Sequence, residues 1–272
     1  MPPAPVPAGC DGLRGSIGVT LGSTWLNGDA VNRPEADEFD SALVELRLGY
    51  DFSSSLYGQL DVMGEFTDVD NSMPDSYQDG LGAAFHLMYT NDGCCGIGIF
   101  GGLFETTQDN NNTDTSERYL VGIEGLAGVG GFDLHWQVGG LFGDGGTDDL
   151  GEDSLTDFYF GRLVASKSLG NGWRVGAEVS YGEGDMDNYL DSIEYYGWGA
   201  FVEKQLGTDW ILALVYDGAR YDQPEENDVI TEHFVGLNAR YYFGAGTSEE
   251  CAPKLTLPRV MRWMALTGGP LE

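Results

Sequence analysis

Ala42-Leu-Val-Glu-Leu-Arg-Leu-Gly-Tyr-Asp-Phe52 is the stretch of sequence that decides the fold. Its even-numbered positions, from Ala42 to Phe52, are all apolar, whereas Glu45, Arg47 and Asp51 stand at odd-numbered positions. A period of two places alternate side chains on opposite faces of a β-strand. The stretch therefore predicts a strand with one apolar face and one polar face.

The same alternation recurs along the chain and predicts twelve strands in one all-β domain. The abundance of glycine (42 residues) and of aromatic residues (12%) also favours strands and turns over helices. Three of the expected strands, 158–168, 193–205 and 210–220, are apolar on both faces, so the pattern does not orient them. The expected strands are 13–25, 42–52, 56–66, 81–90, 95–104, 118–129, 132–142, 158–168, 173–182, 193–205, 210–220 and 233–243.

The connections between these strands are alternately short and long. The short ones carry turn residues: Ser53-Ser54, Asn91-Asp92-Gly93, Gly130-Gly131, Gly170-Asn171-Gly172 and Gly207-Thr208-Asp209. The long ones hold 29 of the 44 acidic residues and one base, Arg33; they span 27–41, 68–80, 105–117, 143–157, 183–194 and 221–232. This segregation is typical of barrels with short periplasmic turns and long extracellular loops. We therefore predict a twelve-stranded antiparallel up-and-down transmembrane β-barrel with acidic extracellular loops.

Strand length and aromatic placement agree with a membrane barrel. A tilted strand of ~9–11 residues crosses the hydrocarbon layer, and the expected strands are about that long. Apolar runs such as 211–216 are too short for a membrane helix, which needs ~18 residues. Aromatic residues near strand ends predict interfacial girdles; they are Trp25, Tyr50, Phe52, Phe66, Trp173, Tyr181, Trp210, Tyr241 and Phe243.

The last expected strand reads Val-Gly-Leu-Asn-Ala-Arg-Tyr-Tyr-Phe over residues 235–243, with an apolar residue at every second position. It resembles the closing-strand signal of porin-like bacterial outer-membrane barrels, in which a terminal aromatic residue is recognised by the barrel assembly machinery. The resemblance implies an outer-membrane location and contact with outer-membrane lipid. The chain departs from the pattern, because residues 244–272 follow Phe243.

The two ends of the chain frame the barrel expected over residues 12–243. Residues 1–11 are expected to be a periplasmic segment. Pro-Pro-Ala-Pro-Val-Pro after Met1 does not have the pattern of a secretory signal peptide, so we expect that a start Met replaces a signal peptide that has been removed. The extension 244–272 carries Lys254, Arg259 and Arg262 among apolar residues and predicts a short basic amphipathic helix. A lumen plug, a membrane-surface helix, a partner peptide and a flexible or cloning-derived extension all remain open.

All four cysteines fall near the short-turn side of the expected barrel. Closure makes the first and last strands neighbours, so we predict a disulfide between Cys10 and Cys251 in an oxidising periplasm. Cys94 and Cys95 follow a tight turn and have three open states: a vicinal bridge, two thiols, or a link between chains. Zinc is not expected, because the spacing of these cysteines is not that of a zinc site.

Charged residues of both signs fall on the expected lumen face. These predicted lining residues are Arg14, Glu45, Arg47, Asp61, Glu65, Glu124, Asp133, Arg162, Arg174, Glu178 and Arg240. Rows of opposite charge can line a selective pore, or they can neutralise one another in a blocked lumen. We favour a channel for small polar solutes or cations; the alternative is a non-conducting structural or adhesive barrel whose loops bind divalent metal, lipid or a surface partner. The net charge of −31 argues against nucleic acid as a partner.

Neither catalysis nor a tightly bound cofactor is expected. The available imidazoles are His86, His135 and His233, and no serine-rich motif accompanies them. Acidic loops can bind Ca²⁺ or Mg²⁺ through carboxylate oxygens. The candidate calcium ligands are Asp68, Asp70, Asp144, Asp148 and Asp149, with a solvated acidic surface as the simpler interpretation. The pattern leaves the solute and the oligomeric state undetermined.

Overall fold

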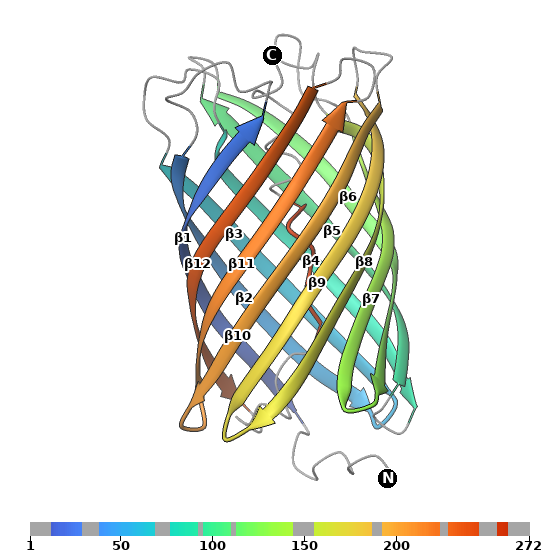
Figure 1. The fold of residues 1–272 in the computed structure, drawn as a ribbon. Helices are drawn as coiled ribbons and strands as arrows, with labels where there is room; N and C mark the ends of the chain where they lie inside the picture. Colours follow the sequence, from blue (N-terminus) through green and yellow to red (C-terminus); the bar gives the residue numbers. More distant parts are fainter. Residues whose placement is uncertain are drawn as a thin grey trace.

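The alternating segments form antiparallel strands in the computed structural model, and β1 pairs with β12 to close a barrel (Figure 1). The structure describes residues 12–28, 38–68, 77–91, 95–109, 113–143, 155–186, 192–223, 228–244 and 255–260. The expected twelve strands are confirmed. They are β1 (Leu13–Gly28), β2 (Glu38–Ser53), β3 (Leu56–Asp68), β4 (Tyr77–Asn91), β5 (Cys95–Asp109), β6 (Thr113–Val129), β7 (Phe132–Phe142), β8 (Leu155–Gly170), β9 (Trp173–Met186), β10 (Ser192–Leu206), β11 (Trp210–Gln223) and β12 (Asp228–Gly244).

The short turns lie together at one end of the barrel, which we call the turn side (Figure 1). Gly130 and Gly131 both have positive φ, at 61° and 83°, and so do Asn171 and Gly172. Backbone of this kind matches the twist of a two-residue hairpin and favours Gly and Asn. The β2–β3 turn is Ser54–Ser55, one residue later than predicted, because β2 continues through Ser53.

At the opposite end, the loop side, several strands are longer than predicted. β6 begins at Thr113 rather than at residue 118, and β12 begins at Asp228 rather than at 233. These ends pair through backbone hydrogen bonds, which polar residues such as Thr113 and Thr115 support without an apolar face. The predicted loops 105–117, 183–194 and 221–232 are therefore mostly strand. The acidic centres of the long loops lie outside the described residues.

The outer wall of the barrel is apolar. Mid-strand residues such as Leu21 and Leu237 are 60% and 67% exposed, as the alternation predicts. Exposed aromatic side chains gather toward both ends of the wall: Tyr50, Phe52, Tyr89, Phe132, Trp173, Trp210 and Tyr241 on the turn side, and Trp25, Phe66, Tyr119, Tyr159, Tyr181 and Tyr196 on the loop side. Lys167 and Lys204 lie over Phe132 and Trp173. The wall has the apolar band and aromatic girdles of a membrane barrel.

The described residues contain no helix with the length and apolar character needed to cross a bilayer.

The interior differs from the expected polar lumen in its loop-side half. A cluster of buried apolar residues fills it, including Phe100, Phe104, Phe158, Phe160, Leu120, Leu141, Ile193, Tyr195, Tyr221 and Ile230. These residues come in part from β8, β10 and β11, the strands that are apolar on both faces, so apolar side chains point inward as well as outward. The polar lumen with charges of both signs that the sequence predicts therefore does not extend through this half.

Candidate functional site in the barrel lumen

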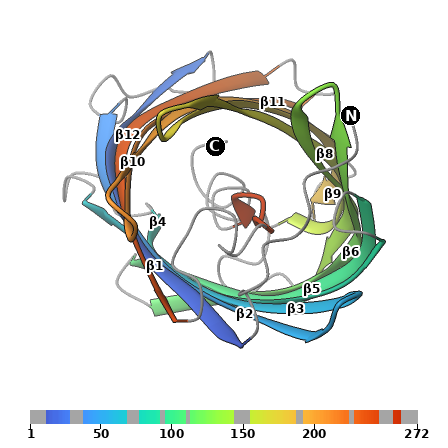
Figure 2. The ribbon, with the colours of Figure 1, turned by 90° about the horizontal axis from the view of Figure 1, so that it is seen from below.

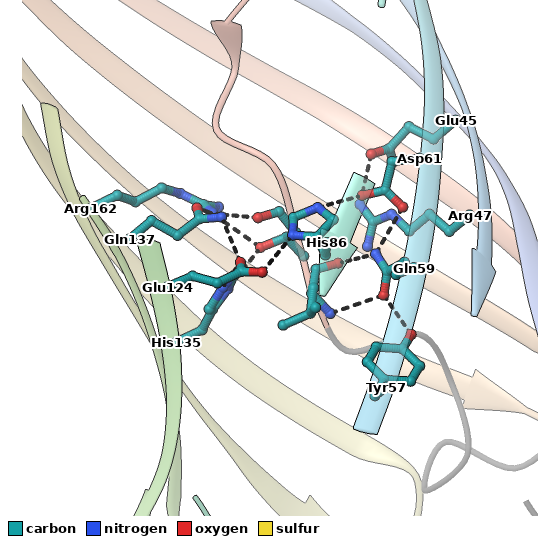
Figure 3. A network of polar contacts seen from close by, with 12 residues as sticks. Glu45, Arg47, Tyr57, Gln59, Asp61, His86, Glu124, His135, Gln137 and Arg162 are labelled. Carbon is teal, nitrogen blue, oxygen red and sulfur yellow. Dashed lines mark hydrogen bonds and ion pairs between the residues drawn. The ribbon is translucent and has the colours of Figure 1, made fainter. Parts of the chain in front are cut away.

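The turn-side half and the middle of the lumen hold a network of buried polar side chains (Figure 3). Glu124 on β6 is fully buried and accepts hydrogen bonds from His86 Nδ1 at 2.8 Å, His135 Nε2 at 3.0 Å and Gln137 Nε2 at 3.1 Å. His86 Nε2 also lies 3.3 Å from Asp61 Oδ2. These residues come from β3, β4, β6 and β7, so the carboxylate ties together strands that are not all neighbours.

Arg162 on β8 extends this network toward β9. Its Nε and Nη2 donate to the two carboxylate oxygens of Glu178, each at 2.7 Å, and its Nη1 donates to Gln137 Oε1 at 2.7 Å. A bidentate guanidinium–carboxylate pair is a strong and directional contact. Arg162 is therefore held rigidly with one nitrogen directed into the lumen.

Most of the remaining predicted lining residues form pairs along the wall. Glu45 binds Arg47 at 2.7 Å and Arg240 at 3.2 Å, and Arg14 binds Asp51. Arg174 donates to Ser166 at 2.7 Å and lies 3.9 Å from Glu203. Opposite charges thus neutralise one another, as one of the two predicted interpretations requires. Asp133 is exposed beside the Gly130–Gly131 turn and does not join the network that the structure describes around Glu124.

Residues 255–260 of the C-terminal extension lie inside the barrel (Figures 1 and 2). We call this part, Leu-Thr-Leu-Pro-Arg-Val, the lumen segment. Leu255 packs with Tyr57 and Met88 near the turn side, whereas Leu257 and Val260 belong to the apolar cluster of the loop-side half. Residues 255–259 are not helical and Val260 is, whereas most of the expected amphipathic helix, from residue 261 on, lies outside the described residues and stays a prediction. Pro258 disfavours helical backbone at the residue before it.

The turn-side part of the lumen segment is held by two side chains on opposite walls. Gln59 Nε2 donates to the carbonyl oxygen of Leu255 at 2.9 Å, and Gln59 Oε1 accepts from the Leu255 N–H at 3.4 Å. Arg162 Nη1 donates to the carbonyl oxygen of Thr256 at 3.0 Å and to its hydroxyl at 3.1 Å. Hence the segment bridges β3 and β8 through its backbone.

The loop-side part of the lumen segment is held by charge. Arg259 donates to Asp217 Oδ2 on β11 at 2.9 Å and lies 3.5 Å from Glu65 Oε1 on β3. Its guanidinium also lies 4.3 Å from the centroid of the Phe234 ring on β12. Two carboxylates and an aromatic face together form a site for a cation.

Sequence reasoning placed Glu65 and Arg162 in the lumen but missed Asp217 and Phe234. Asp217 lies in β11, whose faces the period does not orient, whereas Phe234 lies in β12 on the face opposite to the outward apolar residues Val235 and Leu237. A signal for Asp217 exists, since it is the single charge within the apolar run of residues 210–219. An isolated charge in such a run is rarely left buried without a partner.

The histidines divide between the lumen and the loop-side rim of the wall. His86 and His135 are buried in the Glu124 network. His233 stands instead with aromatic neighbours from the next two strands, Tyr216 and Trp198. Its Nδ1 lies 3.0 Å from the Tyr216 hydroxyl oxygen, to which Trp198 Nε1 donates at 3.2 Å. His233 thus belongs to the rim rather than to the lumen network.

Two predictions fall on parts of the chain that the structure does not describe. The predicted disulfide joins Cys10 to Cys251, both outside the described residues, and Cys94 is outside them as well. Cys95 is exposed at the start of β5. The candidate calcium ligands Asp70, Asp144, Asp148 and Asp149 and the side chain of Asp68 also lie outside the described part. Both predictions stay predictions.

A closed antiparallel barrel with an apolar outer wall defines the class: this is the fold of bacterial outer-membrane β-barrels. An outer-membrane channel from Pseudomonas putida F1 is similar with a TM-score of 0.59 and 15% identity, over 89% of this chain and 99% of that one. The β domain of the Bordetella autotransporter BrkA is similar with a TM-score of 0.50 and 15% identity, over 86% of this chain and 100% of that one. The CymD monoaromatic hydrocarbon channel has a TM-score of 0.47 and 10% identity, over 86% of this chain and 89% of that one. No protein-family model and no curated protein matches the sequence. At these identities the similarity to the first two structures shows a shared fold.

Proposed function

We propose that the protein is an outer-membrane channel for small polar solutes or cations, closed in the observed conformation by its lumen segment. The observation that carries the proposal is that a separate piece of chain, and not the wall itself, occupies the axis of the barrel (Figure 2). Withdrawal of residues 255–260 would free the lumen-facing groups of Gln59, Arg162, Glu65 and Asp217 that now contact the segment.

The polar contacts that hold the lumen segment are of an exchangeable kind. Leu255 and Thr256 are bound through hydrogen bonds, and Arg259 through ion pairs and a ring face. Water or a polar solute can replace such partners, whereas a strand pair of the wall offers no such exchange. The net charge of −31 supports a preference for cations, because an acidic protein concentrates cations near its surface.

A second candidate function is a non-conducting structural or adhesive barrel. The observation in its favour is the buried apolar cluster, to which Leu257 and Val260 contribute. In this case the acidic loops would carry the function and bind divalent metal, lipid or another surface. Calcium or magnesium binding at Asp68, Asp70, Asp144, Asp148 and Asp149 belongs to this candidate.

The outer-membrane location rests on the apolar wall and on the closing strand β12. Leu237 is 67% exposed, and exposed apolar area of this extent requires lipid or detergent around it. Purified protein should stay monodisperse only with an amphiphile, and should change its gel mobility on heating. Monodisperse behaviour in plain buffer would contradict the membrane location and the channel together.

Single-channel recording in planar bilayers separates the two candidate functions. The unaltered protein should show rare discrete openings, and Arg259→Ala should raise the open probability on the order of tenfold, which corresponds to about 1.4 kcal/mol of lost segment binding. Arg220→Ala is the matched control: it removes an arginine from the outer rim, where Arg220 pairs with Asp222. Absence of conductance steps in every variant would favour the structural barrel.

A further inference from the structure

The lumen segment occupies its site in the way that a bound ligand does. It offers two kinds of group to the wall: acceptor oxygens at Leu255 and Thr256, and one cation at Arg259. The wall presents a complementary group to each kind. Gln59 and Arg162 donate hydrogen bonds to the oxygens, and the carboxylates of Asp217 and Glu65 bind the cation.

The cation site is built from three strands that converge on one point of the lumen. Asp217 is on β11, Glu65 on β3 and Phe234 on β12, and the side chains of Glu65 and Phe234 are 2% exposed. A buried carboxylate is costly without a positive partner. When Arg259 leaves, the buried carboxylate of Glu65 therefore favours another cation in its place, and Asp217, whose side chain is 36% exposed, adds a second negative charge beside it.

The donor site lies further toward the turn side and selects carbonyl oxygens. Arg162 keeps its position when the lumen segment leaves, because Glu178 and Gln137 hold it independently at 2.7 Å. Gln59 is held likewise by Asp61 and by the hydroxyl of Tyr57. The donors are therefore preorganised, which lowers the cost of binding a new acceptor.

We propose that the lumen binds cationic, peptide-like solutes, which carry a guanidinium or amine for Asp217 and Glu65 and an amide carbonyl for Arg162. The lumen segment is then an internal competitor that such a solute displaces. This inference rests on the proposed function, of which it names the solute class.

The test uses two peptides that differ only in charge. Acetyl-Thr-Leu-Pro-Arg-amide reproduces residues 256–259, and its twin carries citrulline, a neutral isostere of arginine. Binding is measured on full-length Arg259→Ala in detergent, from the temperature at which the folded band on an unheated gel disappears. We expect the arginine peptide to bind about tenfold tighter than its twin or better, because its hydrogen bonds are charge-assisted.

Two further variants make the binding result specific. Adding Asp217→Asn to Arg259→Ala should abolish the difference between the peptides, whereas adding Arg220→Ala, which lies outside the lumen, should leave it intact. Equal binding of the two peptides to Arg259→Ala, or a difference that persists with Asp217→Asn, overturns the inference.

Recording on the unaltered protein gives a second measurement that needs no variant to fold. The arginine peptide should increase the open probability by competing with the lumen segment, and the citrulline peptide should not. Channels that open but respond equally to both peptides overturn the solute class and leave the channel in place. A charge-dependent thermal shift without any conductance supports the binding site and contradicts the channel.

Discussion

The two halves of the lumen are filled by different chemistry. In the turn-side half and the middle, Glu124 accepts a hydrogen bond from His86, and Gln137 connects Glu124 to Arg162. In the loop-side half, Phe158 and its aromatic neighbours pack as in the core of a soluble protein. The lumen segment contributes to both, through Thr256 in one half and Val260 in the other. The difference teaches that a barrel interior can be closed by polar pairing and by apolar packing in a single structure.

The largest expected effect is in the polar half, at Glu124. Glu124→Gln keeps the size of the side chain but removes a buried charge that accepts three hydrogen bonds. We expect a loss of about 3 kcal/mol in the free energy of unfolding, the scale of a broken buried ion pair. The measurement is urea unfolding in lipid vesicles.

The control for this variant is Glu194→Gln, at an exposed rim position where Glu194 accepts one hydrogen bond from Tyr196. It should cost about 0.5 kcal/mol. If the two variants lower the free energy of unfolding by the same amount, the stability of the polar half does not depend on the carboxylate of Glu124.

A medium effect is expected in the apolar half, at Gly182. A Cβ at this position would lie 2.2 Å from Phe158 Cζ in the packed cluster. Gly182→Ala should therefore cost about 2 kcal/mol through overpacking. Gly161→Ala, on the neighbouring strand β8, is the matched control, because no atom lies within 4 Å of its added Cβ. Equal unfolding midpoints for the two would mean that the cluster is loosely packed.

The smallest expected effect concerns the link between the lumen segment and the polar half. Thr256→Ala removes the hydroxyl that accepts from Arg162 at 3.1 Å but keeps the backbone carbonyl. The lumen segment should then bind the wall less tightly by about 1 kcal/mol, which should raise the open probability about fivefold in bilayer recordings. Thr256→Ser should restore the unaltered behaviour, since it keeps the hydroxyl. Failure of serine to restore it would assign the effect to the lost methyl group.

The strand ends were predictable on the turn side and less so on the loop side. Gly130, Gly131 and Asn171 stand at turns that need positive φ, and β7 and β9 begin at the predicted residues. Such constraints are local and can be seen in the sequence. On the loop side, Thr113 begins a strand that continues with polar residues, and Asp228 begins one in which the apolar residues Val229 and Ile230 are adjacent rather than alternating. Periodicity of apolar residues cannot detect such extensions.

The site was predictable by face but not by partner. Alternation placed Asp61, Glu124 and Arg162 in the lumen, where the structure has them buried. Their contacts depend on strand tilt: His86 and Glu124 meet although β5 lies between β4 and β6. The lumenal position of Arg259 was one of several open interpretations, because an amphipathic segment suits a membrane surface and a lumen equally well.

The place of the lumen segment in the chain bears on the order in which the barrel can assemble. β12 completes the wall by pairing with β1, and residues 255–260 come after β12. The barrel wall can therefore close before residues 255–260 enter the lumen, and these residues can leave and re-enter without breaking any strand pair. The part of the chain that is synthesised after β12 would then close a barrel whose wall is already complete.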